Sequence, residues 1–290
     1  MGLTLRRHPL AWRRLSGGRV SQGSATVRFW GVRDHIAVPG PETAVYGGNT
    51  PCVEVRVDDT LLIFDSGTGI RLLGRALARN GAASGDLFFA HTQFDRISGL
   101  PFFGAAFVPG NVFRLWAGQP TGSPGIEDVL RRLMTDPIFP VPLEVMRAKL
   151  EFHDFAAGAS LTPRPGITVR TQGFNGEARP VTGYRVEHAG TVVCYVTDVN
   201  PSYGPNESAL ATLIDGATLV VIGFESETAT DIDAAWHWAA ERCAHARAGT
   251  MVLTNHAHGL DDARLDGIAA RLAERYAGAL VAREGMVLQV

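Results

Sequence analysis

The sequence contains no long apolar run. Although 46% of its 290 residues are hydrophobic, no stretch approaches the roughly 20 apolar residues that a membrane-spanning helix requires. We therefore expect no transmembrane segment. A chain of this length and apolar content is able to bury a large core, as one domain or as two closely joined halves.

Cysteine is scarce. The three cysteines, Cys52, Cys194 and Cys243, form no C-x-x-C pair, and each lies in an apolar context. This odd number without a pairing pattern predicts buried free thiols rather than a disulfide framework. Because free thiols persist in reducing compartments, we expect a cytoplasmic protein.

Neither sign of charge is in clear excess. The chain has 27 Lys and Arg against 29 Asp and Glu, a net charge of −2. No general attraction to nucleic acid follows, so nucleic acid is not expected as the main partner. Residues 1–25 are the exception, because they contain several arginines and no acidic residue. We expect this segment to be a flexible tail or to dock to a partner or a membrane surface.

Residues 26–290 are expected to form one domain, because short strands and helices alternate without a Gly/Ser linker. Residues 52–64 alternate apolar and polar around Asp58-Asp59, which predicts a β-hairpin. Further strands are predicted at 167–171, 181–187, 191–197 and 218–222, with helices at 206–215, 231–248 and 261–276. Antiparallel hairpins mixed with intervening helices favour a core of two sheets with helices outside.

Eight segments, in order, carry a resemblance to a known family. They read VRFWGVR, PGPETAVYGGNTPCVEV, FDSGTGIRLLGRAL, SGLPFF, RRLMTDPIFPVPLE, TGYRVE, YVTDVNP and AREGM. From about residue 27 to residue 290 the chain resembles the metallo-β-lactamase-fold hydrolases. Within them it is most similar to the phosphodiesterase-type branch that includes the phosphoribosyl cyclic phosphate phosphodiesterases. The resemblance implies an α/β fold, an αββα sandwich of two mixed sheets with helices on both outer faces.

The same resemblance implies a dinuclear metal site. In the family, two metal ions flank a hydroxide and neutralise the charge that develops on a phosphodiester. The ligands come from a His-x-His-x-Asp-His motif, a later His, a bridging Asp and a final His. Carried over to this chain, the seven positions are His91, Gln93, Asp95, Arg96, Gly176, Asp198 and Asn255.

Only His91, Asp95 and Asp198 match the ligand types that the family uses. A glutamine amide is a poor zinc ligand, and the guanidinium of Arg96 cannot ligate because it has no lone pair to give. We interpret the stretch HTQFDR, residues 91–96, as the remnant of a degenerate metal site. We expect Arg96 to replace a metal electrostatically by pairing with Asp95 or Asp198. The alternative is an exposed loop arginine.

Three other histidines lie where a site for a single metal could be rebuilt. His35 precedes the motif, and His256 and His258 follow the position of the lost final ligand. No cofactor is expected. If one divalent ion (Zn, Mn or Fe) is bound, we expect His91, Asp198 and His256 to hold it. Otherwise these histidines are hydrogen-bonded structural residues.

These observations favour a pseudoenzyme that keeps the fold and binds a protein partner or a small anionic ligand. The alternative is an atypical metal-dependent hydrolase of phosphodiester-type substrates with a rebuilt mononuclear site. An ordinary family hydrolase would require a misalignment, and the ungapped match of LTNHAHGLDDARLDGI to the family's final-ligand segment argues against one. No catalytic residue is assigned. Asp65 in DSGTG is expected to orient the metal loop by hydrogen bonds.

Overall fold

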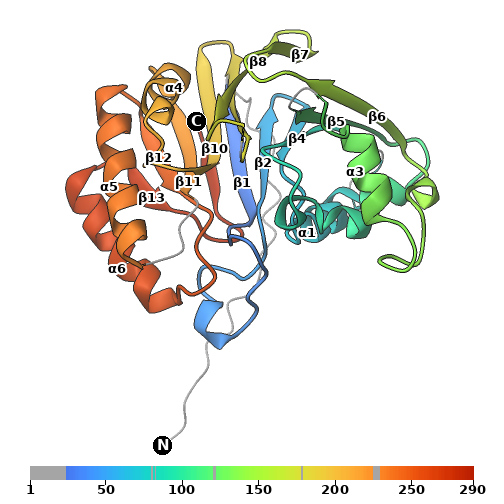
Figure 1. Cartoon of the computed structure of the whole chain (residues 1–290), viewed down its shortest axis with the longest axis horizontal. Coiled ribbons are helices and arrows are strands. Elements are labelled where there is room, and N and C mark those ends of the chain that lie inside the picture. The colour runs from blue at the N-terminus through green and yellow to red at the C-terminus, as the bar shows by residue number, and fades with distance from the viewer. Residues whose placement is uncertain (1–23, 80, 82, 120–121, 178, 225–228) are drawn as a thin grey trace, which may run out of the picture.

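Two β-sheets lie side by side in the computed structural model, and helices cover their outer faces (Figure 1). The structure describes residues 24–79, 81, 83–119, 122–177, 179–224 and 229–290. The predicted basic segment therefore lies outside the described residues, apart from its last two. Within the described part, no helix has both the length and the apolar character needed to cross a membrane.

The first sheet comes from the amino-terminal half and is closed at one edge by the last strand of the chain. Its seven strands run in the order β14-β1-β2-β3-β4-β5-β6. They are β14 (Val287–Gln289), β1 (Ala25–Gly31), β2 (Cys52–Val57), β3 (Thr60–Phe64), β4 (Ser84–Phe89), β5 (Val112–Gly118) and β6 (Lys149–Phe155). The pairs from β14 to β3 are antiparallel, and those from β3 to β6 are parallel.

The second sheet comes from the carboxyl-terminal half. Its seven strands run in the order β13-β12-β11-β10-β9-β8-β7. They are β13 (Ala279–Val281), β12 (Thr250–Leu253), β11 (Leu219–Phe224), β10 (Thr191–Val199), β9 (Val181–His188), β8 (Ile167–Phe174) and β7 (Ser160–Arg164). Here β10 to β13 are parallel, and β7 to β10 are antiparallel.

The predicted two-sheet core and its mixed pairing are confirmed. The hairpin of residues 52–64 is β2 and β3, paired antiparallel, with Asp58 in the left-handed turn conformation (φ 50°). The strands and helices predicted in the second half are all present, with ends displaced by a few residues.

Six α-helices accompany the sheets in the described part of the chain, and those flanking the first sheet are shorter. They are α1 (Ile70–Leu77), α2 (Phe94–Ile97), α3 (Ile126–Leu133), α4 (Pro205–Ile214), α5 (Ala229–His245) and α6 (Asp262–Arg275). The apolar face of α1 is buried through Ile70, Leu73 and Leu77. Asp261 caps α6, because its Oδ1 accepts a hydrogen bond of 2.7 Å from the backbone N–H of Arg264.

Aromatic side chains join the two sheets. Phe64 and Phe88 of the first sheet pack on Tyr184 and Tyr195 of the second, with 5.0 Å between the ring centroids of Phe64 and Tyr195. All four side chains are buried. Burial of such a ring stabilises the fold by roughly 1.5–3 kcal/mol. The two halves are therefore fixed against each other next to the strand ends.

The carboxyl ends of several strands meet at one edge of the sandwich. Asp65 follows β3, His91 follows β4, Asp198 lies near the end of β10 and Asn255 follows β12. Because β3 is parallel to β4 and β10 is parallel to β11 and β12, these residues leave their sheets in the same direction. This edge holds the candidate site.

Candidate functional site

Arg96 is the centre of the site. It lies in α2, its side chain is 0% exposed, and it reaches across to the loops that follow β3, β10 and β12. Its Nη1 donates to Asp65 Oδ2 at 3.2 Å, and its Nη2 donates to Asp198 Oδ2 and, at 2.8 Å, to Asn255 Oδ1. The alternative of an exposed loop arginine is wrong. A buried guanidinium requires such partners, because leaving it unpaired would cost several kcal/mol.

Two further carboxylates surround the guanidinium without accepting a well-directed hydrogen bond from it. Asp95 Oδ2 lies 2.9 Å from Arg96 Nε, yet the N–H does not point along this contact. Asp34 Oδ1 lies 3.8 Å from Nη2. Both carboxylates balance the charge of the guanidinium but do not fix its orientation. The pairings that the sequence predicts, with Asp95 or Asp198, are thus present with both residues.

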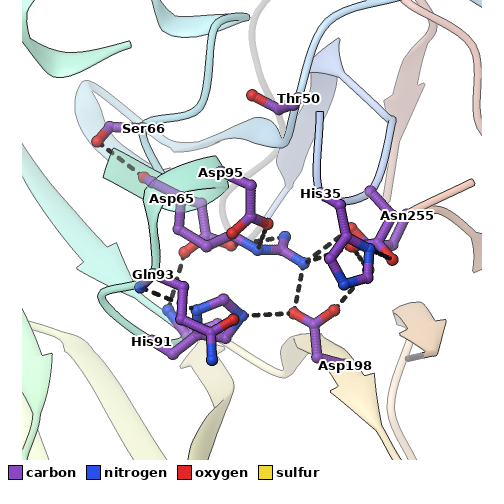
Figure 2. A network of polar contacts seen from close by, with 12 residues as sticks. His35, Thr50, Asp65, Ser66, His91, Gln93, Asp95, Asp198 and Asn255 are labelled. Atoms are coloured by element: carbon purple, nitrogen blue, oxygen red, sulfur yellow. Dashed lines mark hydrogen bonds and ion pairs between the residues drawn. The ribbon is translucent and has the colours of Figure 1, made fainter. Parts of the chain in front are cut away.

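Both oxygens of the Asp198 carboxylate already have donors (Figure 2). Oδ2 contacts His91 Nε2 at 2.9 Å as well as the guanidinium of Arg96, and Oδ1 accepts from Asn255 Nδ2 at 2.6 Å. His91 Nδ1 accepts the backbone N–H of Gln93 at 3.3 Å. The proton of this imidazole is therefore on Nε2 and is donated to Asp198.

Asn255 completes the network through both ends of its amide. Its Oδ1 accepts from Arg96, and its Nδ2 donates to Asp198 Oδ1 and, at 3.1 Å, to Asp34 Oδ1. An amide offers one acceptor and two donors. The side chain is buried, and every one of these groups has a partner.

Asp65 links the network to both sheets. Its Oδ2 accepts the hydroxyl of Tyr195 at 2.7 Å in addition to Arg96, and its Oδ1 accepts the backbone N–H of Ala90 at 2.8 Å. Ala90 directly precedes His91. The predicted orienting role of Asp65 toward the loop after β4 is therefore confirmed.

Burial and charge act in opposite directions on these groups. Burial raises the pKa of Asp198, but the charge of Arg96 and the hydrogen bond from His91 outweigh it, so that this pKa lies below its usual value. Burial also raises the pKa of Asp65, and Arg96 offsets only part of that rise. Burial acts to lower the pKa of Arg96, yet the surrounding carboxylates raise it well above its usual value. Arg96 is therefore a fixed positive charge.

The backbone is strained where the network is anchored. Non-glycine residues rarely adopt φ values near +60°, and each such residue costs on the order of 1–3 kcal/mol. Of the eight described non-glycine residues with positive φ, five contribute to this site: His35, Asp65, Asn175, Asp198 and Asn255. The contacts of the network offset this cost, which makes the strand-end loops part of a built site.

Gln93, His35 and His258 lie at the edge of the network. The exposed Gln93 precedes α2, and its backbone holds the ring of His91. His35 pairs through Nδ1 with the carboxylate of Asp34, which raises the pKa of His35. The exposed His258 lies against His35, with 6.4 Å between the ring centroids.

His256 and Gly176 are not part of the network. His256 is buried, its Nε2 lies 2.9 Å from the carbonyl oxygen of Ala282, and burial lowers its pKa to about 4. It lines a separate small pocket beneath α5 and α6. Gly176 has φ +67° and lies near the hydroxyl of Tyr203. The structure therefore does not bring His256 to His91 and Asp198.

The donor set does not fit the two metal ions of the family. In the described part of the chain, no three His, Cys, Asp or Glu side chains are arranged to hold a metal ion. His91 uses both ring nitrogens within the protein, Asp198 uses both oxygens, and Arg96 fills the space between the carboxylates. Metal ligands must instead offer free lone pairs.

A small pocket of about 20 Å³ opens beside the network. Asp34, His35, His91, Asp95 and Asp198 line it, together with Arg179 and Asn175. A volume of this size holds about one water-sized group.

Solved structures resemble this chain in fold at low sequence identity. The metallo-beta-lactamase fold protein YhfI from Bacillus subtilis is 16% identical, with a TM-score of 0.64 over 93% of this chain and 100% of its own. A diphosphatase from the PhnP family is 16% identical, with a TM-score of 0.64 over 91% and 97%. Zn(2+)-bound PqqB from Methylobacterium extorquens is 16% identical, with a TM-score of 0.63 over 91% and 99%.

No family model and no curated protein matches the sequence. The structural likeness nevertheless establishes that the chain has the metallo-β-lactamase fold. This agrees with the two seven-stranded sheets and their covering helices. The fold that the sequence resemblance implied is therefore confirmed.

Two members of the site, Asp34 and Tyr195, carry no clear signal in the sequence. Asp34 follows Arg33 in a loop without a recognisable motif, and its neighbour His35 is the residue there with metal-ligand chemistry. Tyr195 lies in β10, where an apolar strand pattern gives no sign that its hydroxyl reaches Asp65. The proximity of Asp198, three residues further along the chain, is the one signal that points to Tyr195.

Proposed function

We propose that this chain is a binding protein built on the metallo-β-lactamase fold and that it does not hydrolyse phosphodiesters. In this proposal the guanidinium of Arg96 takes the place of the metal ions. The main observation behind the proposal is that both carboxylate oxygens of Asp198 already have hydrogen-bond donors, which come from Arg96, His91 and Asn255. The proposal makes the chain a pseudoenzyme.

The chemistry of the network supports this proposal. Metal-assisted hydrolysis needs a water whose pKa is lowered by a cation and a cation that contacts the substrate. The guanidinium of Arg96 is fully buried, and its donors are directed at Asp65, Asp198 and Asn255. A guanidinium in this position neutralises carboxylates and offers nothing to a substrate.

The alternative is a hydrolase with a single metal ion held by His91, Asp198 and His256. The contacts of His256 argue against it. His256 would have to leave the carbonyl of Ala282 and the pocket it lines. His91 would have to give up its hydrogen bond to Asp198 or the one from Gln93. Each change removes a hydrogen bond, worth about 0.5–1.5 kcal/mol, and the one between His256 and Ala282 is buried.

The cysteines support a reducing compartment as the place of action. Cys52, Cys194 and Cys243 are buried free thiols. Burial raises the pKa of Cys194 and Cys243 to about 12, so neither forms a thiolate at neutral pH. We propose a cytoplasmic location on the ground that all three cysteines are free thiols.

The test is hydrolysis of bis-nitrophenyl phosphate with zinc, manganese or iron(II) added. We expect the protein to release nitrophenol no faster than buffer containing the same ion. His91→Ala and Asp198→Ala are the matched variants. Turnover by the wild type that both variants abolish would show a working metal site and refute the proposal.

A further inference from the structure

A second and much larger hollow adjoins the network. This groove of about 950 Å³ lies between the ends of β5 and β8, the start of β9 and one face of α4. Ligand-binding pockets typically measure about 300–1,000 Å³. The groove shares Asn175, Pro180 and Val181 with the small pocket beside Arg96. It therefore has the size and the position of a ligand site next to the network.

The lining of the groove carries almost no charge. Among the described residues that line it, Glu177 is the one charged side chain, and it is exposed. The polar groups are amides and hydroxyls, namely those of Gln119, Gln172, Asn175, Thr182, Tyr203, Asn206, Ser208 and Thr212. Where the groove meets the small pocket, Asp34, Asp95 and Asp198 outnumber the single Arg179. An anion would meet no excess of positive charge at either end.

Two amides of the lining have unused hydrogen-bonding capacity. The Nε2 of Gln119 is buried and has no hydrogen-bond partner. Gln172 donates its Nε2 to the carbonyl of Gly173 at 3.1 Å, so its amide oxygen is the atom that can accept from a ligand. A buried donor without a partner costs about 1–3 kcal/mol. A hydroxyl group, which both donates and accepts, satisfies either amide.

The groove also offers apolar contact. Phe174 and Tyr203 line it, and Tyr203 is 41% exposed. Several small residues, including Gly173, Ala157 and Ala209, also line the groove. A ligand with alternating hydroxyl and C–H surface is able to use both kinds of contact.

We propose that this groove binds an uncharged, hydroxyl-rich ligand of about disaccharide size. The inference deepens the proposed function, since it names the ligand class of a binding protein. It replaces the small anionic ligand that the sequence suggested. Asn175 connects the two regions, because its Nδ2 donates to the backbone carbonyl of Asp198 at 2.7 Å.

Saturation-transfer NMR tests directly whether the protein binds a neutral disaccharide. The probes are maltose, cellobiose and trehalose, with trehalose 6-phosphate and N-acetyl-dialanine methylamide as charged and amide counterparts. Each is used at about 5 mM, which detects ligands with Kd near 1 mM, and EDTA is present. We expect transfer to at least one neutral disaccharide and none to the phosphate or the amide.

Matched variants locate the site. Ala209 in α4 and Ala269 in α6 both pack partly buried against the same core, but only Ala209 lines the groove. Ala209→Phe should weaken disaccharide binding at least about tenfold, or 1.4 kcal/mol, whereas Ala269→Phe should leave it unchanged. Gln119→Leu should also weaken binding without lowering the melting temperature, because it removes an unpartnered buried amide.

The inference is overturned if none of the three disaccharides binds, or if the phosphate or the amide binds as well as they do. It is also overturned if Ala209→Phe binds like the wild type. Because EDTA is present, a hidden metal-dependent activity would refute the proposed function and leave this result intact. The two failures are therefore distinguishable.

Discussion

At the scale of single residues, Arg96 is the central group of the site. Four carboxylates surround one guanidinium within 4 Å, and the side chain of Arg96 has no exposure to solvent. A positive charge in this place is required by the fold, because carboxylates brought together without one repel each other and take up protons. Arg96 is therefore a structural cation.

Replacing Arg96 by alanine should destabilise the protein by ~3–5 kcal/mol at pH 7, as expected when one partner of a buried ion pair is removed. Burial then raises the pKa of Asp198 without the opposing charge of Arg96. A buried carboxyl group with a raised pKa destabilises the folded state only while it is ionised. The stability difference between wild type and Arg96→Ala should therefore shrink as the pH falls from 7 toward 4. Chemical unfolding of the wild type and of Arg96→Ala between pH 7 and pH 4 measures this difference.

Two other variants serve as controls. Arg131 forms an exposed pair with Glu127, and Arg131→Ala should leave the melting temperature almost unchanged. Arg96→Lys keeps the charge but loses the planar fork, so its stability should lie between wild type and Arg96→Ala. Equal stability of Arg96→Ala and wild type at every pH would show that the network contributes nothing to the fold.

The residue identities of the site were only partly predictable. His91, Asp95, Arg96 and Asp198 lie in recognisable motifs, and charge complementarity alone predicts that Arg96 meets a carboxylate. The bridging geometry of Asn255 was not predictable, because it depends on how closely the ends of two different sheets approach. The sequence pattern of one segment gives no information about the distance between the strand ends of the two sheets.

At the scale of elements, the loops between strands and helices carry the strain and the polar network. The loop after β12 is held from two sides: the backbone N–H of His256 donates to the carbonyl of Val32, and its side chain reaches Ala282. This single residue therefore connects β12 to the loops that follow β1 and β13. Its burial makes that connection sensitive to acid.

His256 should make the protein less stable as pH falls from 7 to 5. Burial lowers its pKa to about 4 in the folded protein, whereas the unfolded chain binds a proton near pH 6.5. The unfolded state thus carries more protons in this window, and stability should fall by about 2 kcal/mol from this group.

Equilibrium unfolding at pH 7 and pH 5 measures the effect, with His256→Gln as the comparison. Glutamine does not titrate and keeps a donor for the carbonyl of Ala282. The variant should lose about 2 kcal/mol less than the wild type between the two pH values. Identical losses in both proteins would mean that folding does not lower the pKa of His256 and would contradict this prediction.

At the scale of the whole molecule, the site joins two halves of the chain. Asp65, His91 and Arg96 come from the half of the chain that forms most of the first sheet, and Asp198 and Asn255 come from the half that forms the second. The sandwich itself was predictable, because strands such as β9 and β10 show a strong apolar pattern and a short turn. The edge strands β13 and β14, with three residues each, are too short to give a periodic signal.

Building the metal site that the sequence resemblance implies should require several changes together, because its ligand positions come from both halves. Arg96→His alone should bind no zinc, since the positions of Gln93, Gly176 and Asn255 still lack imidazoles. The fourfold variant, in which all four positions become His, should bind zinc measurably in calorimetry. Gly176 has φ +67°, so some stability should be lost as well. Zinc binding by Arg96→His alone would contradict the arrangement.

The zinc content of the purified wild-type protein tests the central claim most directly. After incubation with excess zinc and dialysis, elemental mass spectrometry should find well under one equivalent per chain, because Arg96, His91 and Asn255 already occupy the oxygens of Asp198. The fourfold histidine variant is the positive control. Two retained equivalents in the wild type would show that the metals displace Arg96 and would contradict the account.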